Sequence, residues 1–336
     1  MQWFVAVPDC PAGLRVLEDL RPPWSVLVRH ASGRPWLVGR VPTGHCQELS
    51  TGDRRVAVIG RARPDAAVLD RLLASLSVDH GVPGPSPVAG SAHVAVSEPG
   101  RFRLHGTASG LRRVYAARVH GVTVAADRAD VLAGLSAAGT DERWLAVQLI
   151  ADGPPHPLDR LTPWTGVLAV PPGDALTVDA EGGSAQARWW SPPKPDRPLT
   201  TGAPALRSAL AEAVALRVAA TPASTLGCDL SGGMDSTALA FLANDAGAPL
   251  HTLTLEFRDP ANDDTRWADL ARSHLPDAVA LDLPQDRLPG QYANLGRPRT
   301  PTDAPSGALR GRAVLEASSA RYREHGIGLQ LAGHGG

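Results

Sequence analysis

Residues 226–237 combine side chains and glycines that could hold an anion. They read Leu-Gly-Cys-Asp-Leu-Ser-Gly-Gly-Met-Asp-Ser-Thr, an apolar segment followed by two glycines and then by residues that favour a helix. Gly232 and Gly233 permit backbone conformations that a Cβ forbids, so amide N–H groups can converge on an anion at the positive end of a helix that begins near Asp235. This pattern predicts phosphate binding, with the Asp235 carboxylate available to a hard cation such as Mg²⁺.

Two simpler interpretations of this stretch stay open. Two glycines also occur in ordinary turns from a strand to a helix, without any ligand. A hydrolase nucleophile at Ser231 is favoured less, because no Gly-x-Ser-x-Gly turn surrounds it. Nucleotide binding is the better interpretation, since the residue types match in register within a strand, loop and helix.

The pattern Ser-Gly-Gly-x-Asp-Ser resembles the PP-loop of ATP pyrophosphatases, which adenylate a carboxylate or carbonyl and release pyrophosphate. The resemblance implies ATP and Mg²⁺ as cofactors, with Asp235 as the metal ligand. It implies that adenine is bound by the backbone of two residues, and that a second glycine-containing loop helps to bind phosphate. The implied pyrophosphate ligands are Ser231, Gly232, Gly233, Ser236 and Thr237, the implied adenine contacts are Leu230 and Leu255, and the second loop contributes Gly333 and Gly335.

Composition restricts the class of protein. The chain has 336 residues, of which 43% are hydrophobic, enough to build two domains. With 33 basic and 34 acidic residues, nothing in the charge favours binding to nucleic acid or to an anionic membrane. No apolar run reaches the roughly 20 residues of a membrane span, and no signal peptide is recognisable. We therefore expect a cytoplasmic protein whose partners are small molecules or peptides. Cys10, Cys46 and Cys228 are expected to be reduced thiols.

The first half of the chain has the pattern of an α+β domain. Short β-rich runs alternate with turn signals, and Gly121 predicts a hairpin between the last two. Because strands and helices are segregated and do not alternate, an α+β arrangement is favoured. The expected strands are 3–7, 24–28, 36–38, 56–59, 93–96, 114–119 and 122–126, and the expected helices are 65–76, 128–137 and 142–150.

The second half predicts a doubly wound parallel sheet. Residues 191–198 are rich in proline and predict a connector, so we divide the chain into domains at 1–190 and 203–336 with a linker at 191–202. An amphipathic helix is expected at 203–219, with Leu206, Leu210, Val214 and Val218 on one apolar face. Strands at 250–257, 278–283 and 327–332 then alternate with helices at 265–273 and 307–324.

A second resemblance covers most of the chain. Gly110-Leu-Arg-Arg-Val-Tyr-Ala, Ala125-Ala-Asp-Arg-Ala-Asp-Val-Leu, the turn Pro171-Pro172-Gly173 and the run Arg188-Trp-Trp follow the order of segments in glutamine amidotransferase domains. Such domains precede the synthetase half of asparagine synthetases. The resemblance implies a domain similar to N-terminal nucleophile hydrolases, followed by a PP-loop domain similar to the adenine nucleotide alpha hydrolases.

The amidotransferase resemblance breaks at the nucleophile. In the working family, residue 2 is a cysteine that becomes the N-terminus once Met1 is removed, whereas this chain has Gln2. Glutamine-binding segments of the family are also missing. We expect a degenerate domain without glutaminase activity.

The end of the chain departs from the family as well. The second phosphate loop of the family continues to an Asp that binds a second Mg²⁺, and this chain stops one residue earlier, after Gly336. We therefore expect the domain to be incomplete, its catalytic residues to lie beyond Gly336, and the chain alone to be inactive. We also expect the parallel sheet to lack most of its covering helices.

The choice of amide bond rests on weaker signals. Residues 302–306, Thr-Asp-Ala-Pro-Ser, resemble an Asp-Glu-Pro-Ser segment of lasso-peptide cyclases, which join a peptide's N-terminal amine to an Asp or Glu side chain. The resemblance implies a precursor peptide as substrate, and a leader-peptide-binding or protease partner. Asp303 could equally cap the following helix. The alternatives are an asparagine synthase-like ligase that acts on a small amino acid without glutaminase activity, and an inactive nucleotide-binding fragment.

Overall fold

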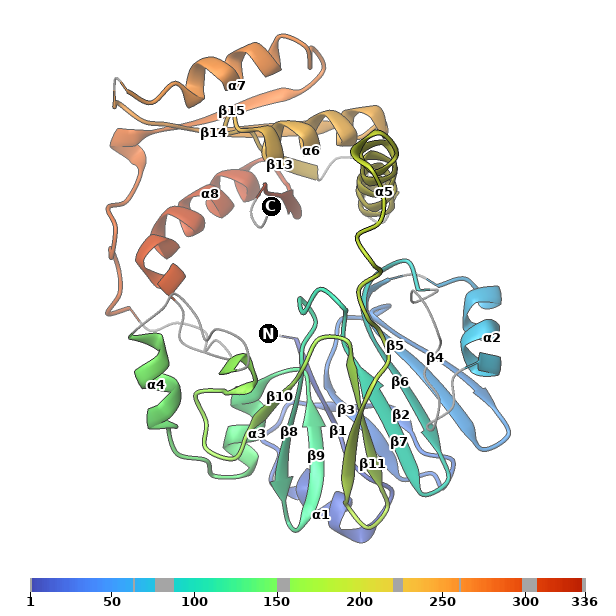
Figure 1. The fold of residues 1–336 in the computed structure, drawn as a ribbon. Coiled ribbons are helices and arrows are strands. Elements are labelled where there is room, and N and C mark those ends of the chain that lie inside the picture. Colours follow the sequence, from blue (N-terminus) through green and yellow to red (C-terminus); the bar gives the residue numbers. More distant parts are fainter. Residues whose placement is uncertain are drawn as a thin grey trace. The chain divides into compact units, whose positions relative to one another are not determined.

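The computed structural model describes residues 2–62, 64–75, 88–149, 158–219, 226–259, 261–297 and 307–333. Contacts between Cα atoms divide them into two compact units, unit 1 up to Pro193 and unit 2 from Lys194 onward (Figure 1). Residues 302–306 and Gly335 lie outside the described residues, as do Leu76 and Ile150 at the ends of two predicted helices. Among the described residues, no helix is both long and apolar enough to cross a bilayer.

Unit 1 contains two antiparallel sheets, each with six strands among the described residues. The first sheet has the order β10-β8-β9-β1-β3-β2 and the second β12-β11-β7-β6-β5-β4. The first consists of β1 (Trp3–Ala6), β2 (Ser25–Arg29), β3 (Pro35–Arg40), β8 (Val114–Val119), β9 (Val122–Ala126) and β10 (Leu168–Val170). The second consists of β4 (Cys46–Thr51), β5 (Arg54–Ala62), β6 (Gly90–Glu98), β7 (Arg101–His105), β11 (Asp174–Asp179) and β12 (Ser184–Arg188).

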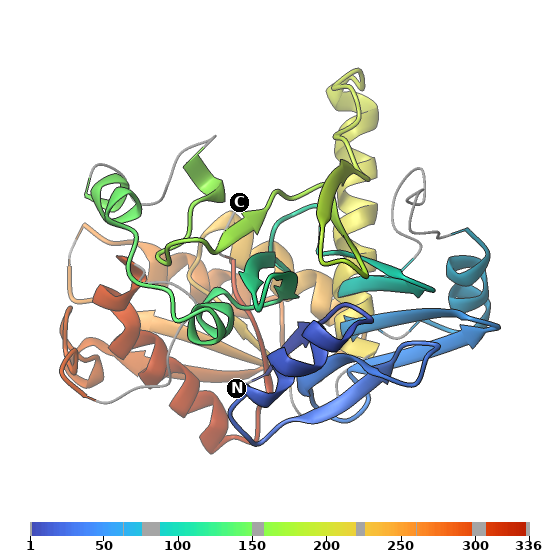
Figure 2. The same cartoon turned by 90° about the horizontal axis from the view of Figure 1, so that it is seen from below.

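The two sheets bury a common core and carry helices on their outer faces (Figures 1 and 2). Phe4 and Trp36 of the first sheet meet Phe102 of the second in this core. Outside the first sheet lie α1 (Pro11–Glu18) and α3 (Ala129–Leu135), and outside the second lies α2 (Ala66–Ser75). The remaining helices are α4 (Glu142–Gln148) and the 3₁₀ turn η1 (Leu158–Arg160). Antiparallel sheets with helices outside them confirm the α+β class for this half.

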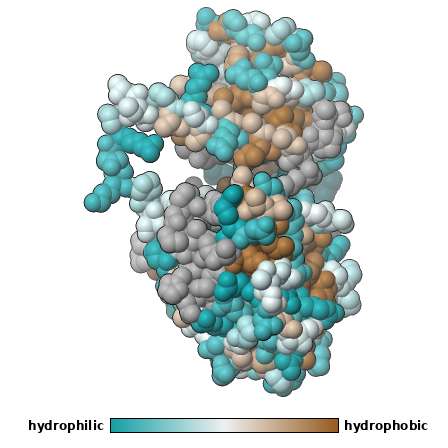
Figure 3. Space-filling view, turned by 90° about the vertical axis from the view of Figure 1, so that its right-hand side faces the viewer, coloured by the Kyte–Doolittle hydropathy of each residue, from teal (hydrophilic) through white to brown (hydrophobic). Residues whose placement is uncertain are grey.

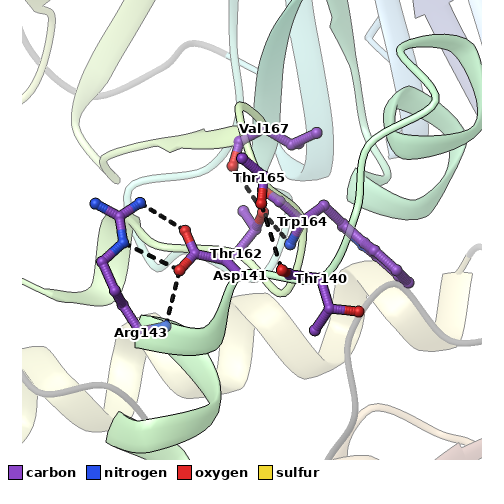
Figure 4. A network of polar contacts seen from close by, with 7 residues as sticks. All are labelled: Thr140, Asp141, Arg143, Thr162, Trp164, Thr165 and Val167. Atoms are coloured by element: carbon purple, nitrogen blue, oxygen red, sulfur yellow. Dashed lines mark hydrogen bonds and ion pairs between the residues drawn. The ribbon is translucent and has the colours of Figure 1, made fainter.

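Helix α4 is fixed by polar contacts at its first residue (Figure 4). Asp141 caps it by accepting the Arg143 N–H at 2.9 Å, and the Arg143 guanidinium donates to both Asp141 oxygens at 3.0 and 2.6 Å. These bonds hold the pKa of Asp141 below its usual value. In the neighbouring turn the Thr162 hydroxyl donates to the Val167 carbonyl at 2.6 Å. The cap explains why the helix begins at Glu142, as the sequence predicts.

Five strands and one α-helix of unit 1 were not predicted, namely β4, β7, β10, β11, β12 and α1. Strand β4 is an edge strand with mostly polar residues, and β7 alternates Arg101 and Arg103 with apolar residues, so both lack a continuous β-rich run. Helix α1 has only eight residues and no side-chain cap. The hairpin at Gly121 is confirmed, because β8 and β9 pair through a turn in which His120 and Gly121 both have positive φ.

Unit 2 is built on a parallel sheet with the order β15-β14-β13-β16. Its strands are β13 (Leu226–Asp229), β14 (Leu250–Glu256), β15 (Val279–Pro284) and β16 (Leu329–Leu331). Its helices are α5 (Leu199–Ala219), α6 (Met234–Asp245), α7 (Asp264–Arg272) and α8 (Arg312–Glu324), with 3₁₀ turns η2 (Gln285–Arg287) and η3 (Gly307–Gly311). The predicted alternation of strands and helices is confirmed, with shifts of one to five residues at most boundaries.

Helices contact both faces of this sheet. Val214, Ala240 and Ala268, from α5, α6 and α7, join the cluster on one face. Tyr322 of α8 joins Leu253 and Leu281 on the other face (Figure 1). The expectation that most covering helices are absent is therefore wrong for the described residues.

Helix α5 differs from its prediction. It begins at Leu199, inside the segment assigned to the linker, because the Pro198 carbonyl accepts the Thr201 and Gly202 N–H groups. Of its predicted apolar face only Val214 is buried, whereas Leu206 is 62% exposed and Leu210 40%. Figure 3 looks onto the side that carries α5, where apolar atoms lie at the surface. The prediction of one buried face is wrong for the first half of α5, because its Leu206 and Leu210 side chains are exposed among the described residues.

Candidate nucleotide-binding site

The carboxyl ends of β13 and β16 mark the point where the chain reverses its direction across the sheet. From β13 the chain crosses to β14 and then to β15, and from β15 it returns past both to β16 on the other side of β13. In open α/β sheets, ligands bind in the crevice at such a switch point. The residues that follow β13, Leu230 to Gly233, are named here the glycine loop, and they lie at this edge.

The fold requires glycine at only one of the two glycine positions in this loop. Gly232 has φ +79°, and a Cβ on it would meet the Asp264 carbonyl oxygen at 2.4 Å and the Trp267 Cβ at 2.8 Å. The loop therefore fits against the first turn of α7 only without a side chain. Gly233 has an ordinary φ of −70°, and a Cβ there would meet only the Ser231 hydroxyl, at 3.5 Å. The fold does not require glycine at this second position, which is exposed at the start of α6.

A pair of hydroxyls closes the glycine loop onto α6. The Ser236 Oγ lies 2.9 Å from the Ser231 Oγ and accepts the Ser231 N–H at 3.2 Å. Ser236 is buried, whereas Ser231 is exposed. Because the first amides of a helix have no intrahelical acceptors, the amides of α6 point out of its start beside these hydroxyls. This is an arrangement that favours an anion.

Gly333 brings a second backbone segment to the same helix start. A Cβ on Gly333 would meet the Ser236 amide nitrogen at 2.5 Å and the Asp235 carbonyl carbon at 3.0 Å. The predicted second loop is thus next to the first one, at the switch point. Gly335 lies outside the described residues.

Leu230 is held in place from the α7 side. Its amide donates to the Leu253 carbonyl at 2.8 Å, and its carbonyl accepts the Thr254 hydroxyl at 2.8 Å. The Arg272 guanidinium in turn donates to Thr254 Oγ1 at 2.8 Å and to Asp282. With its amide bonded to Leu253, Leu230 can offer a ligand only the second lone pair of its carbonyl.

Leu255 faces the space above the end of β13. In a parallel ladder the peptide groups of alternate residues point to the same neighbour, and those of Leu253 point to β13. The peptide groups of Leu255 therefore point toward the glycine loop, beyond the last β13 residue that pairs, Asp229. The structure brings together all the predicted contacts except Gly335, which lies outside the described residues.

Asp235 and Thr237 occupy the first turn of α6. Asp235 is exposed, so its carboxylate can reach a ligand from solvent. The Thr237 hydroxyl is buried and has no hydrogen-bond partner among the residues that the structure describes. Within the described ranges, no three or more His, Cys, Asp or Glu side chains are grouped as a metal site. A Mg²⁺ ion at Asp235 would need phosphate oxygens and water for its other ligands, which is common for this ion.

Sequence reasoning missed the residues that surround β13. Asp229, the last residue of β13, accepts the Tyr322 hydroxyl at 2.9 Å and the Gln330 amide at 2.8 Å. The sequence feature that could have identified Asp229 is a carboxylate at the end of an apolar strand. The preceding Cys228 is fully buried, and burial raises the pKa of its thiol to about 12, so it stays protonated and unreactive.

Comparisons with known proteins agree with the nucleotide site. Residues 205–288, which include the glycine loop, α6 and β14, match the asparagine synthase family. A carboxyethyl-arginine beta-lactam-synthase of Streptomyces clavuligerus is 32% identical over 233 residues, covering 62% of this chain and 44% of that protein. The chain spans less than half the length of the curated relative it matches.

Solved structures give a much weaker likeness. The glutamine phosphoribosylpyrophosphate amidotransferase from B. subtilis, complexed with ADP and GMP, is 11% identical with a TM-score of 0.30, covering 98% of this chain and 90% of that one. A structure described as the allosteric regulatory enzyme of purine biosynthesis is 11% identical with a TM-score of 0.30, covering 89% of this chain and 76% of that one. A TM-score of 0.30 is too low to establish a common fold.

Proposed function

We propose that unit 2 binds ATP and transfers its AMP group to a carboxylate, which an amine then attacks to form an amide. The observation that carries the proposal is the meeting of the glycine loop, the start of α6 and Gly333 at the switch point. The match of residues 205–288 to the asparagine synthase family supports it. The chain would then act as a carbon-nitrogen ligase.

The chemistry explains why these residues are needed. A carboxylate oxygen attacks the α-phosphorus of ATP, pyrophosphate leaves, and the acyl adenylate forms. The amine then attacks the acyl carbon, AMP leaves, and a proton is released. Negative charge gathers on the leaving pyrophosphate, where the first amides of α6 can donate, as can the Ser231 hydroxyl when it accepts from the Ser236 hydroxyl. When bound, Mg²⁺ would neutralise part of this charge, with Asp235 as its ligand from the chain.

For the substrate, we propose a peptide that closes on itself. Gln2 in place of a cysteine removes the nucleophile that would free ammonia from glutamine, so the amine must come from another source. A macrolactam between an N-terminal amine and an Asp or Glu side chain satisfies this requirement. The segment 302–306, which motivates this choice, lies outside the described residues.

A second candidate is closure of a small molecule. It is favoured by the similarity to a carboxyethyl-arginine beta-lactam-synthase over 233 residues. In that case an amine and a carboxylate of one amino-acid derivative would be joined. An asparagine synthase-like ligase that uses free ammonia, and an inactive nucleotide-binding fragment, remain the alternatives.

ATP–pyrophosphate exchange tests the proposal. The chain is incubated with ATP, Mg²⁺ and labelled pyrophosphate, with either synthetic peptides that carry a free N-terminal amine and one Asp or Glu, or free amino acids. Peptide-dependent exchange and loss of one water from the peptide mass support macrolactam formation, whereas exchange with an amino-acid derivative alone supports the second candidate. ATP binding without exchange in any mixture would indicate a nucleotide-binding fragment, and no ATP binding would contradict the proposal.

A further inference from the structure

Asp229 joins three elements of unit 2 at the base of the nucleotide site. Its carboxylate ends β13 and accepts the Tyr322 hydroxyl of α8 at 2.9 Å. The Gln330 amide of β16 lies 2.8 Å from each of its two oxygens. Although β13 and β16 are far apart in the sequence, they are neighbours in the sheet and pair directly.

The fold makes room for this contact. A Cβ on Gly227, two residues before Asp229 on the same face of β13, would meet the Tyr322 ring at 2.4 Å. The ring is 2% exposed, and burial together with the Asp229 carboxylate raises the pKa of its hydroxyl, so it remains a donor at physiological pH. Gly227 pairs with Gln330 across the two strands, which places the Gln330 amide on the Asp229 side.

Both strands lead directly into the nucleotide site. Two residues after Asp229 comes Ser231, whose amide and hydroxyl bond to Ser236. Three residues after Gln330 comes Gly333, whose backbone lies against the Ser236 amide. The hydrogen bonds between Asp229 and Gln330 therefore lie directly before the two segments that meet at the start of α6.

We infer that Asp229 is a positioning residue, which holds Gly333 and the glycine loop at the spacing that phosphate binding requires. It touches no ligand and acts through Tyr322 and Gln330. The inference deepens the proposed function and rests on it only for the identity of the ligand, ATP. The spacing itself can be measured without ATP.

The test compares Asp229→Ala with Asp229→Asn in the full chain. Asp229→Ala removes both contacts, so we expect faster amide hydrogen exchange in residues 231–237 and 329–333 and about tenfold weaker ATP binding. Asp229→Asn should restore most of both properties. Its oxygen can still accept from Tyr322, and the Gln330 amide can turn its oxygen toward the new NH₂ group.

Two further variants separate positioning from general stability. Tyr322→Phe removes one hydroxyl while keeping the packed ring, and covers the case that Asp229→Ala does not fold. Ile327→Val is the matched control, because Ile327 lies in the same apolar cluster as Tyr322 but contacts neither loop through a polar group. It should lower the melting temperature without speeding exchange in 231–237.

The outcomes are distinct. The inference is overturned if Asp229→Ala and Tyr322→Phe, at equal loss of melting temperature, exchange no faster in 231–237 than Ile327→Val does. It is also overturned if Asp229→Ala binds ATP as tightly as the wild type. If the wild type binds no ATP, the proposed function fails, while the exchange pattern still decides whether Asp229 couples the two segments.

Discussion

The Ser231 and Ser236 hydroxyls lie 2.9 Å apart, which links the glycine loop to the first turn of α6. The Ser236 hydroxyl also accepts the Ser231 N–H, so contacts within the chain fix the shape of the loop. Groups that are already in place need not reorganise when charge develops on a leaving group. Some residues of the glycine loop are therefore needed for folding and others for binding, and mutations can separate the two roles.

Gly232→Ala should destabilise the fold of unit 2. The new Cβ would lie 2.4 Å from the Asp264 carbonyl oxygen at a residue with φ +79°, so α7 or the loop must move. We expect a loss of about 2 to 4 kcal/mol in the free energy of unfolding, measured by urea denaturation.

Gly233→Ala should fold but bind ATP poorly. Its nearest neighbour, the Ser231 Oγ, lies 3.5 Å from the added Cβ, and its φ of −70° suits any residue. A methyl group at the exposed start of α6 would instead occupy space that phosphate needs. Urea denaturation should give nearly the wild-type stability, and calorimetry with ATP should give a binding constant at least about tenfold weaker. Normal ATP binding by Gly233→Ala would remove phosphate from this end of α6.

Asp235→Asn should abolish exchange although it keeps the shape of the side chain. The carboxylate is exposed in the first turn of α6, and Asn lacks the charge that a Mg²⁺ ion requires. We expect carboxylate-dependent ATP–pyrophosphate exchange to fall by about 100-fold or more, and Asp235→Ala to be at least as harmful. Asp245→Asn, at the exposed far end of the same helix, is the control and should exchange normally.

Much of the site was visible in the sequence because it is local. The glycine loop and α6 are contiguous, and the types of Ser231, Gly232 and Ser236 reflect contacts within a few residues of one another. Leu230 and Leu255 were assigned by resemblance to a family, and the pairing of β13 with β14 places them on neighbouring segments of the sheet.

The parts that were missed depend on contacts between distant residues. Asp229 forms hydrogen bonds with Tyr322 and Gln330, which are 93 and 101 residues away in the sequence. No local sequence pattern predicts such contacts. The first half of α5 shows the opposite error, because its helical spacing of leucines is real but Leu206 and Leu210 are exposed in the described part of the chain. Periodicity identifies a face that can be buried, and only the fold decides whether it is.

Asp127 makes the stability of unit 1 depend on pH. It accepts the Phe4 N–H at 2.8 Å, and burial raises the pKa of its carboxyl to about 7 despite this bond. Because the folded pKa lies above the unfolded value of 3.8, the folded state binds the extra proton, and this contribution to stability is lost as pH rises toward 7.

Asp127→Asn should remove this dependence while keeping an oxygen for the Phe4 N–H. The free energy of unfolding of the variant, minus that of the wild type, should rise by about 3 kcal/mol from pH 5 to pH 8. The wild type loses about 1.4 kcal/mol per pH unit until the pH reaches the folded pKa of Asp127. Urea denaturation of both proteins at the two pH values measures the gain. An equal difference in stability at pH 5 and pH 8 would mean that Asp127 titrates normally.

Unit 1 should release no ammonia from glutamine. The first strand begins at Trp3, and the residue before it, Gln2, carries a carboxamide that cannot act as a nucleophile. Cys46 is no substitute, because it lies within β4 and burial raises the pKa of its thiol to about 11, which leaves almost no thiolate at neutral pH. Cys10 precedes α1 and is likewise remote from the N-terminus in sequence.

Coupled detection of ammonia with the purified chain and glutamine measures this activity, and we expect the rate of the buffer alone. Gln2→Cys should stay inactive even after Met1 is removed, because the segments that bind glutamine in amidotransferases are missing from the sequence. A nucleophile speeds a reaction only when the substrate is held beside it. Ammonia release that disappears in Cys10→Ser or Cys46→Ser would refute the assignment, and release by Gln2→Cys alone would show that unit 1 has kept a glutamine site without its nucleophile.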